Sequence, residues 1–236
     1  MQAAVHQPQY LPWSGLFDKI DQADCFVVLD NVQYHKNDWQ NRNRIKTAQG
    51  WCWLTVPVHY HFPQTMREVK VADGDWQRSH WRTITQSYRK APHFERYAQI
   101  LEPLYTASWQ WLVDLNLATM ERLATALGIA WAPRLASEMT LTDEPTQRLI
   151  DICRQVGADT YLAGDGSRRY LDHAKFETAG MGLCFQQFDH PVHAQLHGAF
   201  EPALSMIDLL FNCGPESLAR LRSSRRTPAG PAASMA

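Results

Sequence analysis

Short apolar runs along the chain alternate with segments of helical spacing, and the runs end in polar residues. Residues 3–5 are apolar and stop at His6, residues 13–22 place their large apolar side chains on one helical face, and residues 25–29 are apolar throughout. An uninterrupted apolar run is typical of a parallel strand that is covered on both faces. The pattern predicts strand, loop, helix and strand, which is one βαβ unit.

Polar residues stand at the carboxyl end of each strand in this unit. His6 closes the first strand and Asp30 closes the second, and Gln7, Gln9 and Tyr10 follow His6 directly. Ligands of open α/β sheets bind beyond this edge, where free backbone groups of strand ends and helix starts point outward. We therefore predict His6 and Asp30 as catalytic candidates and Gln7 and Tyr10 as binding candidates. The competing interpretation is that both residues only terminate their strands.

A basic cluster follows the second strand. If residues 37–46 are extended, Arg42, Arg44 and Lys46 share one face, which suits a clamp for phosphate or carboxylate. We favour the clamp over a solvated basic loop because the cluster comes soon after Asp30. The aromatic and β-branched run 51–58 then predicts a buried strand.

The middle of the chain changes character. Residues 76–128 have helical patterning broken near two prolines and ended by Gly128, which predicts a helical insertion. After it, residues 129–135 predict a strand and residues 145–157 a helix. A further strand is predicted at residues 182–187.

A second polar turn follows the predicted strand at residues 159–163. The sequence GDGSRRY brings Gly164, Ser167, Arg168 and Tyr170 to a turn that can offer backbone N–H groups and side-chain donors to an anion. The spacing is not that of a Walker A loop, because the lysine is missing. We predict a phosphate or carboxylate contact here, and an ordinary connecting loop is the alternative.

The histidines and cysteines give weaker signals. His59 and His61 alternate as two metal ligands could, but no third ligand lies nearby in sequence, so we predict no metal site. His193 and His197 could reach the site but lack a diagnostic spacing. The five cysteines contain no CxxC pair and predict neither a disulfide framework nor a zinc site.

Length and charge set outer bounds. The 236 residues fit one α/β domain over residues 1–221 with an insertion at about residues 76–128, and residues 222–236 have the composition of a disordered tail. A formal net charge of −1 gives no global attraction to duplex nucleic acid or to an anionic membrane. The sequence shows neither a run of about 18 apolar residues nor a signal-peptide pattern, so we expect no membrane span and a cytoplasmic location.

Four blocks of the sequence resemble the WbqC-like protein family. They read HQPQYLPWSGLFDKIDQADCFVVLDNVQY, WQNRNRIKTAQGWCWLTVPV, TYLAGDGSRRYLD and LSMIDLLFNCG, and together they cover nearly the whole chain except the tail. The motif positions of the family fall on His6, Gln7, Tyr10, Lys19, Asp30, Arg42, Asn43, Arg44, Lys46, Gly164, Ser167, Tyr170 and Asp172. The family's turn is closer to YLSGPSG or YLSGDSG, so Ala163 stands here without the serine hydroxyl.

The resemblance implies a role in making O-antigen, other surface polysaccharides or specialised metabolites, with transferase chemistry on amino sugars or related small molecules. The chain opens with a strand, a turn that contains a histidine, a helix and an apolar strand. This order of elements is weakly similar to the opening of nucleotidylyltransferases. By that analogy His6 and Lys46 would stabilise charge on the transferred group, and Ser167 and Arg168 would hold the far phosphate. The fold class predicted is therefore α/β, with an open, mostly parallel, Rossmann-like sheet.

Two kinds of function fit these observations. The first is an enzyme that transfers an activated nucleotidyl, acyl or aminoacyl group to a small acceptor. The sequence names no cofactor, although a nucleotide or an activated acyl donor fits, and tRNA as an aminoacyl donor stays open. The second is a non-catalytic assembly partner that uses the aromatic residues between Trp76 and Trp111 as its contact surface.

Overall fold

A parallel sheet forms one end of the molecule. In the computed structural model, which describes residues 1–226, the strands β1 (Gln2–His6), β2 (Cys25–Val28), β7 (Arg134–Leu135), β8 (Thr160–Ala163) and β9 (Gly182–Phe185) pair in the order β7-β2-β1-β8-β9. All four pairings are parallel. The prediction of a parallel α/β sheet is confirmed, and the strand order is that of a Rossmann half extended on one side.

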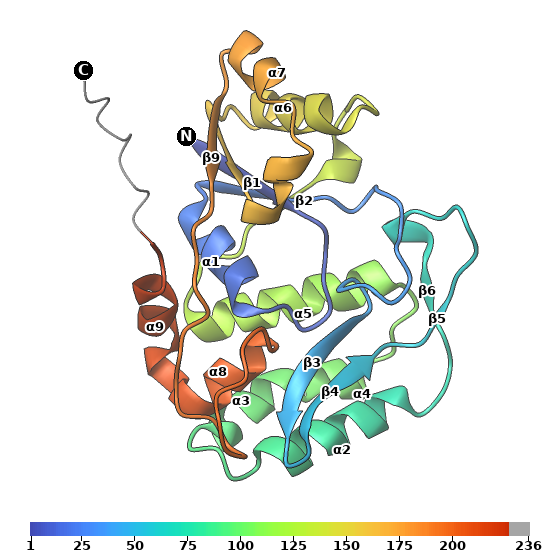
Figure 1. Ribbon diagram of the computed structural model, residues 1–236. Helices are drawn as coiled ribbons and strands as arrows, with labels where there is room; N and C mark the ends of the chain where they lie inside the picture. Colours follow the sequence, from blue (N-terminus) through green and yellow to red (C-terminus); the bar gives the residue numbers. More distant parts are fainter. Residues whose placement is uncertain (227–236) are drawn as a thin grey trace.

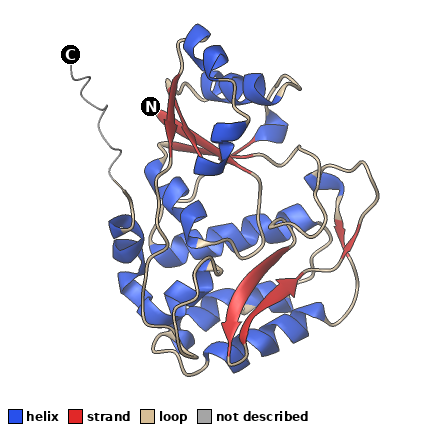
Figure 2. Cartoon of the chain, in the orientation of Figure 1, coloured by secondary structure: helices blue, strands red, loops and turns tan. Residues whose placement is uncertain are grey.

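The two faces of the sheet bury different clusters. Ala4 and Val28 point into one hydrophobic cluster, whereas Val5 and Val27 point into the other, as the two-residue period of a strand requires. Helices α6 (Pro145–Gln155) and α7 (His173–Thr178) pack on the second face. Helix α1 (Ser14–Gln22) lies on the first face, where Leu16, Phe17 and Ile20 enter the core. Figures 1 and 2 show the resulting three layers.

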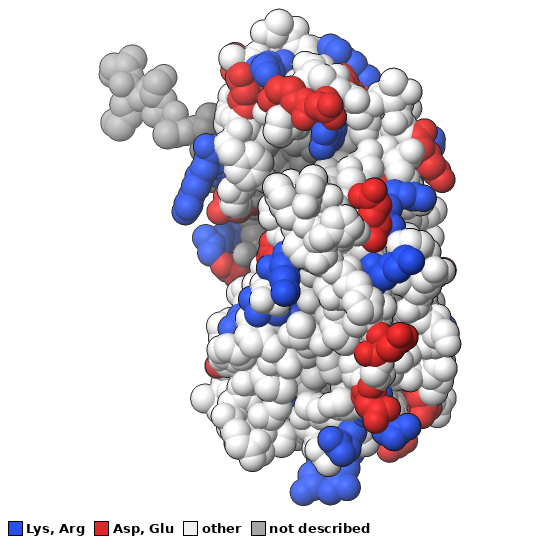
Figure 3. All heavy atoms as spheres, turned by 90° about the vertical axis from the view of Figure 1, so that its right-hand side faces the viewer, with Lys and Arg blue, Asp and Glu red and all other residues white. Residues whose placement is uncertain are grey.

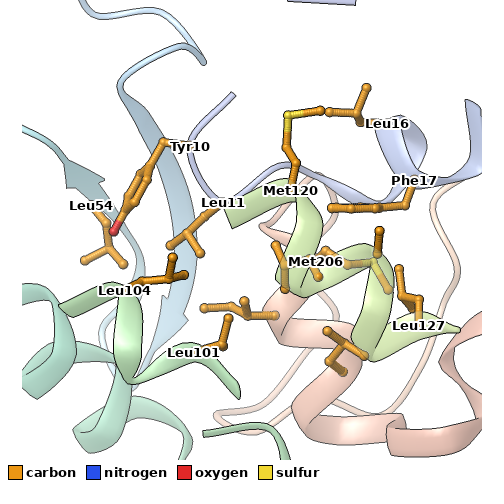
Figure 4. Packing of buried hydrophobic residues seen from close by; sticks show 14 of the residues in the cluster. Tyr10, Leu11, Leu16, Phe17, Leu54, Leu101, Leu104, Met120, Leu127 and Met206 are labelled. Atoms are coloured by element: carbon orange, nitrogen blue, oxygen red, sulfur yellow. The ribbon is translucent and has the colours of Figure 1, made fainter. Parts of the chain in front are cut away.

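The larger core lies below α1. It is built by helices α2 (Trp76–Tyr88), α3 (Phe94–Leu101), α4 (Pro103–Thr106), α5 (Leu112–Leu127) and α8 (Met206–Cys213). Figure 4 shows side chains from α1, α5 and α8 meeting there, among them Phe17, Met120 and Met206, which are each fully enclosed. Helix α5 ends at Gly128, whose φ of 76° is the left-handed conformation that the sequence pattern anticipated for a C-cap.

Two antiparallel ladders lie outside the main sheet. Strands β3 (Arg42–Thr47) and β4 (Gly50–Thr55) form a hairpin, and β5 (Val58–His59) pairs with β6 (Lys70–Val71). The expectation that residues 51–58 form a buried strand is wrong for two of its tryptophans, because Trp51 is 44% exposed and Trp53 is 37% exposed. The face that carries Ile45 and Leu54 packs on the core, and on the opposite face the loop of residues 195–199 covers Lys46, whereas Trp51 and Trp53 stay partly open to solvent.

Short 3-10 helices and one terminal helix complete the described chain. They are η1 (Met66–Glu68), η2 (Ala136–Glu138), η3 (Asp165–Arg169), η4 (Gly214–Glu216) and helix α9 (Ser217–Ser223). Within the described part of the chain, none of the helices combines the length and the apolarity that crossing a bilayer requires.

The C-terminal end of the described chain is held against α1 and the residues after β9. Arg225 contacts the buried carboxylate of Asp18 at 2.6 Å, and the backbone N–H of Arg226 donates to the carbonyl of Gln187 at 3.0 Å. Residues 222–226 thus make specific contacts, although their composition suggested a disordered tail. The remainder of that predicted tail, residues 227–236, lies outside the described residues.

The aromatic residues of α2 and the following helices do not form a contact surface. Trp76 is buried, Trp81 stacks on Tyr105 with ring centroids 5.4 Å apart, and Trp109 donates its indole N–H to the carbonyl of Leu104 at 2.8 Å. The expectation of an aromatic docking face between Trp76 and Trp111 is therefore not supported, because these rings pack against the helices around them.

We expect Phe17→Ala to lower the free energy of unfolding by about 3–5 kcal/mol, because it opens a cavity where α1, α5 and α8 meet. Phe62→Ala is the matched control, since this ring is 71% exposed and its loss should change stability by less than about 0.5 kcal/mol. Urea unfolding of both variants measures the difference. Equal stabilities would contradict the assignment of this cluster as the main core.

Candidate functional site

A cavity of about 1010 Å³ opens beyond the carboxyl ends of β1 and β8. Its wall includes His6 and Gln7 after β1, Gly164 and Ser167 after β8, and Lys19 from α1. These two strands are neighbours, and the chain leaves them toward opposite faces of the sheet, which makes this the topological switch point where α/β proteins bind ligands. The structure brings together the two polar turns that lie about two thirds of the chain apart.

His6 is a neutral imidazole with a defined orientation. Its Nδ1 lies 2.9 Å from the carbonyl of Gln7, so Nδ1 carries the proton and donates, and Nε2 is left with a free lone pair. Burial, together with the nearby Lys19 charge, lowers the pKa of His6 to about 4, and the Gln7 contact partly opposes the shift. Among residues 1–226, Nε2 has no hydrogen-bond partner.

Lys19 supplies a buried positive charge beside His6. Its ammonium donates to the carbonyl of Val5 at 2.8 Å and lies 5.9 Å from the centroid of the Tyr161 ring. Burial lowers the pKa of Lys19 to about 8, so the side chain stays mostly protonated at neutral pH. The helical spacing of α1 places Lys19 one turn beyond Gly15, which also lines the cavity.

The turn after β8 contributes small and polar groups. The Ser167 hydroxyl donates to the carbonyl of Gly164 at 2.6 Å, so its oxygen keeps lone pairs free to accept a hydrogen bond. Tyr170 is 69% exposed at the rim of the cavity. Arg168 turns away from the cavity, because its Nε contacts Asp165 at 2.7 Å and its guanidinium stacks 3.9 Å above Phe185.

Asp172, the last predicted residue of this turn, has a local structural role. Its carboxylate accepts the backbone N–H of Lys175 at 3.3 Å and caps α7. It does not line the cavity.

Two arginines that sequence reasoning missed also line the cavity. Arg148 comes from α6, where its guanidinium donates to the carbonyl of Thr142 at 3.1 Å, and Arg226 comes from the C-terminal segment. With Lys19 they give the wall three cationic side chains, of which Arg148 also pairs with Asp143 and Arg226 with Asp189, whereas the Lys19 ammonium contacts no carboxylate within residues 1–226. Neither arginine follows a strand in the sequence, so no motif signals it.

An aromatic edge, also unpredicted, closes one side of the cavity. Trp13 and Phe188 both line it, with ring centroids 6.0 Å apart. A Cβ on Gly15 would lie 2.0 Å from the Trp13 ring, so only glycine leaves room for the ring at this place.

Asp30 lies at the same edge of the sheet but turns away from the cavity. Its carboxylate accepts from Arg67 at 2.8 Å, from the backbone N–H of Ser137 at 2.9 Å and from the Ser137 hydroxyl at 2.7 Å. The residue is fully buried and ties the segment after β2 to the segment after β7. Its geometry is that of a structural anchor.

Lys46 also lies outside the cavity. The strand alternation of β3 aims it at the loop of residues 195–199, where its ammonium donates to Gln195 Oε1 at 3.0 Å, to the Gly198 carbonyl at 3.3 Å and to the Ala199 carbonyl. The prediction that Lys46 and His6 stabilise charge on one transferred group does not match this geometry. The argument that strand ends meet at one edge of a parallel sheet does not apply to β3, because β3 belongs to a separate hairpin.

The other predicted residues of the first half hold the framework. Asn43 donates to the Leu11 carbonyl at 2.8 Å, and the buried Tyr10 hydroxyl lies 2.9 Å from His80 Nδ1 and 3.0 Å from the Tyr105 hydroxyl. Gln7 Oε1 accepts from Gln40 at 2.7 Å. Of these residues, Gln7 alone lines the cavity. Arg42 and Arg44 stack on tryptophans of β4.

The two candidate histidines nearest the C-terminus form hydrogen bonds outside the cavity. His193 Nε2 lies 2.9 Å from the Asp208 carboxylate, and His197 Nε2 donates to the Ser87 carbonyl at 2.8 Å. Neither lines the cavity. Among the described residues, no group of three or more histidine, cysteine or acidic side chains is arranged to hold a metal ion.

The fold and the cavity together define an α/β protein with a cavity at the switch point of a parallel sheet. The model of the WbqC-like protein family matches residues 7–220, and the chain belongs to this family. It is 38% identical over 227 residues, 94% of this chain and 98% of the other, to the uncharacterized protein Rv1507c of Mycobacterium tuberculosis. No solved structure matched the chain.

The depressed pKa of His6 predicts a pH dependence. Between pH 6.5 and about 4 the unfolded chain binds a proton that the folded imidazole does not, so the free energy of unfolding should fall as the pH falls through this window. His80 is shifted in the same direction by burial. His6→Gln should therefore flatten part of the slope, and His59→Gln, at an exposed position, should not.

Imidazole ¹⁵N spectra of the folded protein measure the same property directly. We expect the His6 resonances to remain those of a neutral ring with the proton on Nδ1 at pH 5.5. Titration of His6 near pH 6.5 would contradict the buried, cation-flanked environment.

Proposed function

We propose that this protein is a transferase that moves an activated nucleotidyl, acyl or aminoacyl group onto an amino sugar or another small acceptor. The observation that carries the proposal is the pairing, in one cavity, of an orientated neutral histidine with the buried ammonium of Lys19. A cavity of about 1010 Å³ lies at the upper end of the range typical of small-molecule sites, which is enough for a donor and an acceptor side by side.

The charge of the wall supports an anionic donor. Nucleotides and coenzyme A esters carry phosphates, and Lys19, Arg148 and Arg226 offer them cationic partners in a partly enclosed space. The whole protein carries a net charge of −1, and the face drawn in Figure 3 mixes both signs. The attraction is thus local to the cavity, which favours a small anion over a membrane surface or a duplex.

His6 is suited to act as the general base. In the proposed step, Nε2 accepts the proton from the acceptor's amine or hydroxyl as its nitrogen or oxygen forms a bond to the donor's carbonyl carbon or phosphorus. The bond to the leaving group breaks, and the leaving group takes the electron pair. In the proposed step the Lys19 charge stabilises the negative charge that grows on the transferred group, and Ser167, which also lines the cavity, contacts the donor.

The low pKa of the free histidine is compatible with this role. A base with a pKa of about 4 is fully unprotonated at neutral pH, and the negative charge of a bound donor would raise that value toward the working range. Lys46 and Asp30 are not part of the proposed step, because neither side chain lines the cavity.

Family membership supports the proposed class of acceptor. The resemblance to a family associated with surface-polysaccharide and specialised-metabolite gene clusters suggests an amino sugar or similar small molecule. This assignment, like the choice of donor, is tested by experiment.

The test combines donor binding with turnover. We expect one donor from a panel of nucleotides, nucleotide sugars, coenzyme A esters and aminoacyl-tRNAs to raise the melting temperature. Lys19→Met should then weaken binding of that donor, because it removes a buried charge from the wall.

His6→Gln should keep donor affinity and lower the single-turnover rate of transfer, followed by mass spectrometry, by about 10²–10⁴-fold. His59→Gln is the control and should behave as the unmodified protein. A panel with no stabilising donor, or full activity in His6→Gln, would refute the proposal.

A further inference from the structure

The outward face of the β3/β4 hairpin carries alternating guanidinium groups and indole rings. Arg42 lies 4.2 Å from the centroid of Trp53, and Arg44 lies 5.0 Å from Trp51 and 5.9 Å from Trp53. Trp39 adds a third ring, 5.6 Å from Trp53. We call Trp39, Arg42, Arg44, Trp51 and Trp53 the tryptophan–arginine ladder.

The register of the hairpin produces this ladder. Arg44 pairs with Trp53 across the strands, and Lys46 pairs with Trp51, so residues two apart on each strand share one face. The opposite face, with Ile45 and Leu54, is buried in the core. Figure 1 shows the hairpin extending away from the main sheet along α2.

The rings of the ladder remain accessible. Trp51 and Trp53 are 44% and 37% exposed, and they are among the few large apolar side chains of the described chain that are exposed to this extent. The hydrophobic core does not account for these two rings, because the residues of the hairpin that enter it, Ile45 and Leu54, lie on the other face. An exposed cluster of aromatic side chains of this kind indicates an interaction surface.

The charges of the ladder are also uncompensated. Within residues 1–226, neither Arg42 nor Arg44 forms an ion pair, in contrast to Arg67, Arg148 and Arg225, which all contact carboxylates. The guanidinium groups lie over the indole rings, and Arg44 also donates to the carbonyl of Ala203 at 3.1 Å, contacts that position both groups without a carboxylate to balance their charge. The surface therefore offers both π faces and positive charge to a ligand.

We propose that the tryptophan–arginine ladder binds unpaired nucleotides of a single-stranded nucleic acid. Bases stack on exposed indoles and on guanidinium planes, and the backbone phosphates pair with the free charges of the arginines. A duplex hides its base faces and does not fit, and a neutral sugar would leave the two charges unpaired. This surface lies outside the cavity, and its test does not depend on the proposed transfer.

The ladder runs toward the cavity. Trp39 lies next to Gln40, whose amide contacts Gln7 on the cavity wall at 2.7 Å. On the other side, His190 packs 5.3 Å from Trp13 of the cavity edge, and the Arg44 charge helps to lower the pKa of His190. A strand lying on the ladder would have one end beside the cavity, and use of that end as a donor rests on the proposed function.

Fluorescence anisotropy of a labelled ten-nucleotide RNA and of the same DNA sequence tests the proposal with the full-length protein. We expect saturable binding that weakens as salt rises, and weaker binding of the matching duplex. Trp51→Ala and Trp53→Ala should each reduce affinity by about tenfold, whereas Trp53→Tyr, which keeps a stacking ring, should retain most of it.

Arg42→Gln should weaken binding and reduce its salt dependence by about one counterion. Phe62→Ala and Arg78→Gln are matched controls for an exposed ring and an exposed charge, and His6→Gln is the control for the cavity. All three should bind as the unmodified protein does. Absence of saturable binding, equal affinity for the duplex, or unchanged affinity in folded Trp51→Ala and Trp53→Ala would overturn the proposal.

Discussion

The parallel pairing of β1 with both β2 and β8 is the constraint on which the rest of the structure depends. Ala3 and Ala4 are completely buried between two neighbours, and the pairing forces the residues that follow β1 and β8 to leave the sheet side by side. Because the connections then turn to opposite faces, a space opens between them. The strand pairing alone brings His6 and Ser167 to that space, and no contact between the two loops is required.

The buried lysine of α1 depends on this arrangement. An ammonium group is costly to bury, and here it is compensated by the carbonyl of Val5 at the end of β1 and by the face of the Tyr161 ring in β8. Burial keeps the neighbouring His6 imidazole neutral, and the Lys19 charge acts in the same direction. One strand end, one helix and one ring therefore set the electrostatics of the cavity, and the cations from α6 and the C-terminal segment extend them.

The sequence predicted the first βαβ unit, the parallel sheet and the two polar turns, because those features are encoded locally in apolar runs and the residues that end them. It did not predict which way Asp30 and Lys46 point. Their partners, Ser137 and Gln195, are about a hundred or more positions away, and no spacing rule connects them. Arg148 and Arg226 were missed for the same reason, since their approach to the cavity is a property of packing. Trp51 and Trp53 were wrongly predicted to be buried, because strands rich in aromatic residues are usually buried.

The most direct test of the account is whether the two turns bind one anion together. In a titration with pyrophosphate, followed by NMR of protein labelled with ¹⁵N at histidine and glycine, the His6 imidazole and the Gly164 and Gly166 amides should shift with the same dissociation constant. His59 should not respond. Shifts of Gly164 and Gly166 that are independent of His6, or no response from either turn, would contradict a shared site at the switch point.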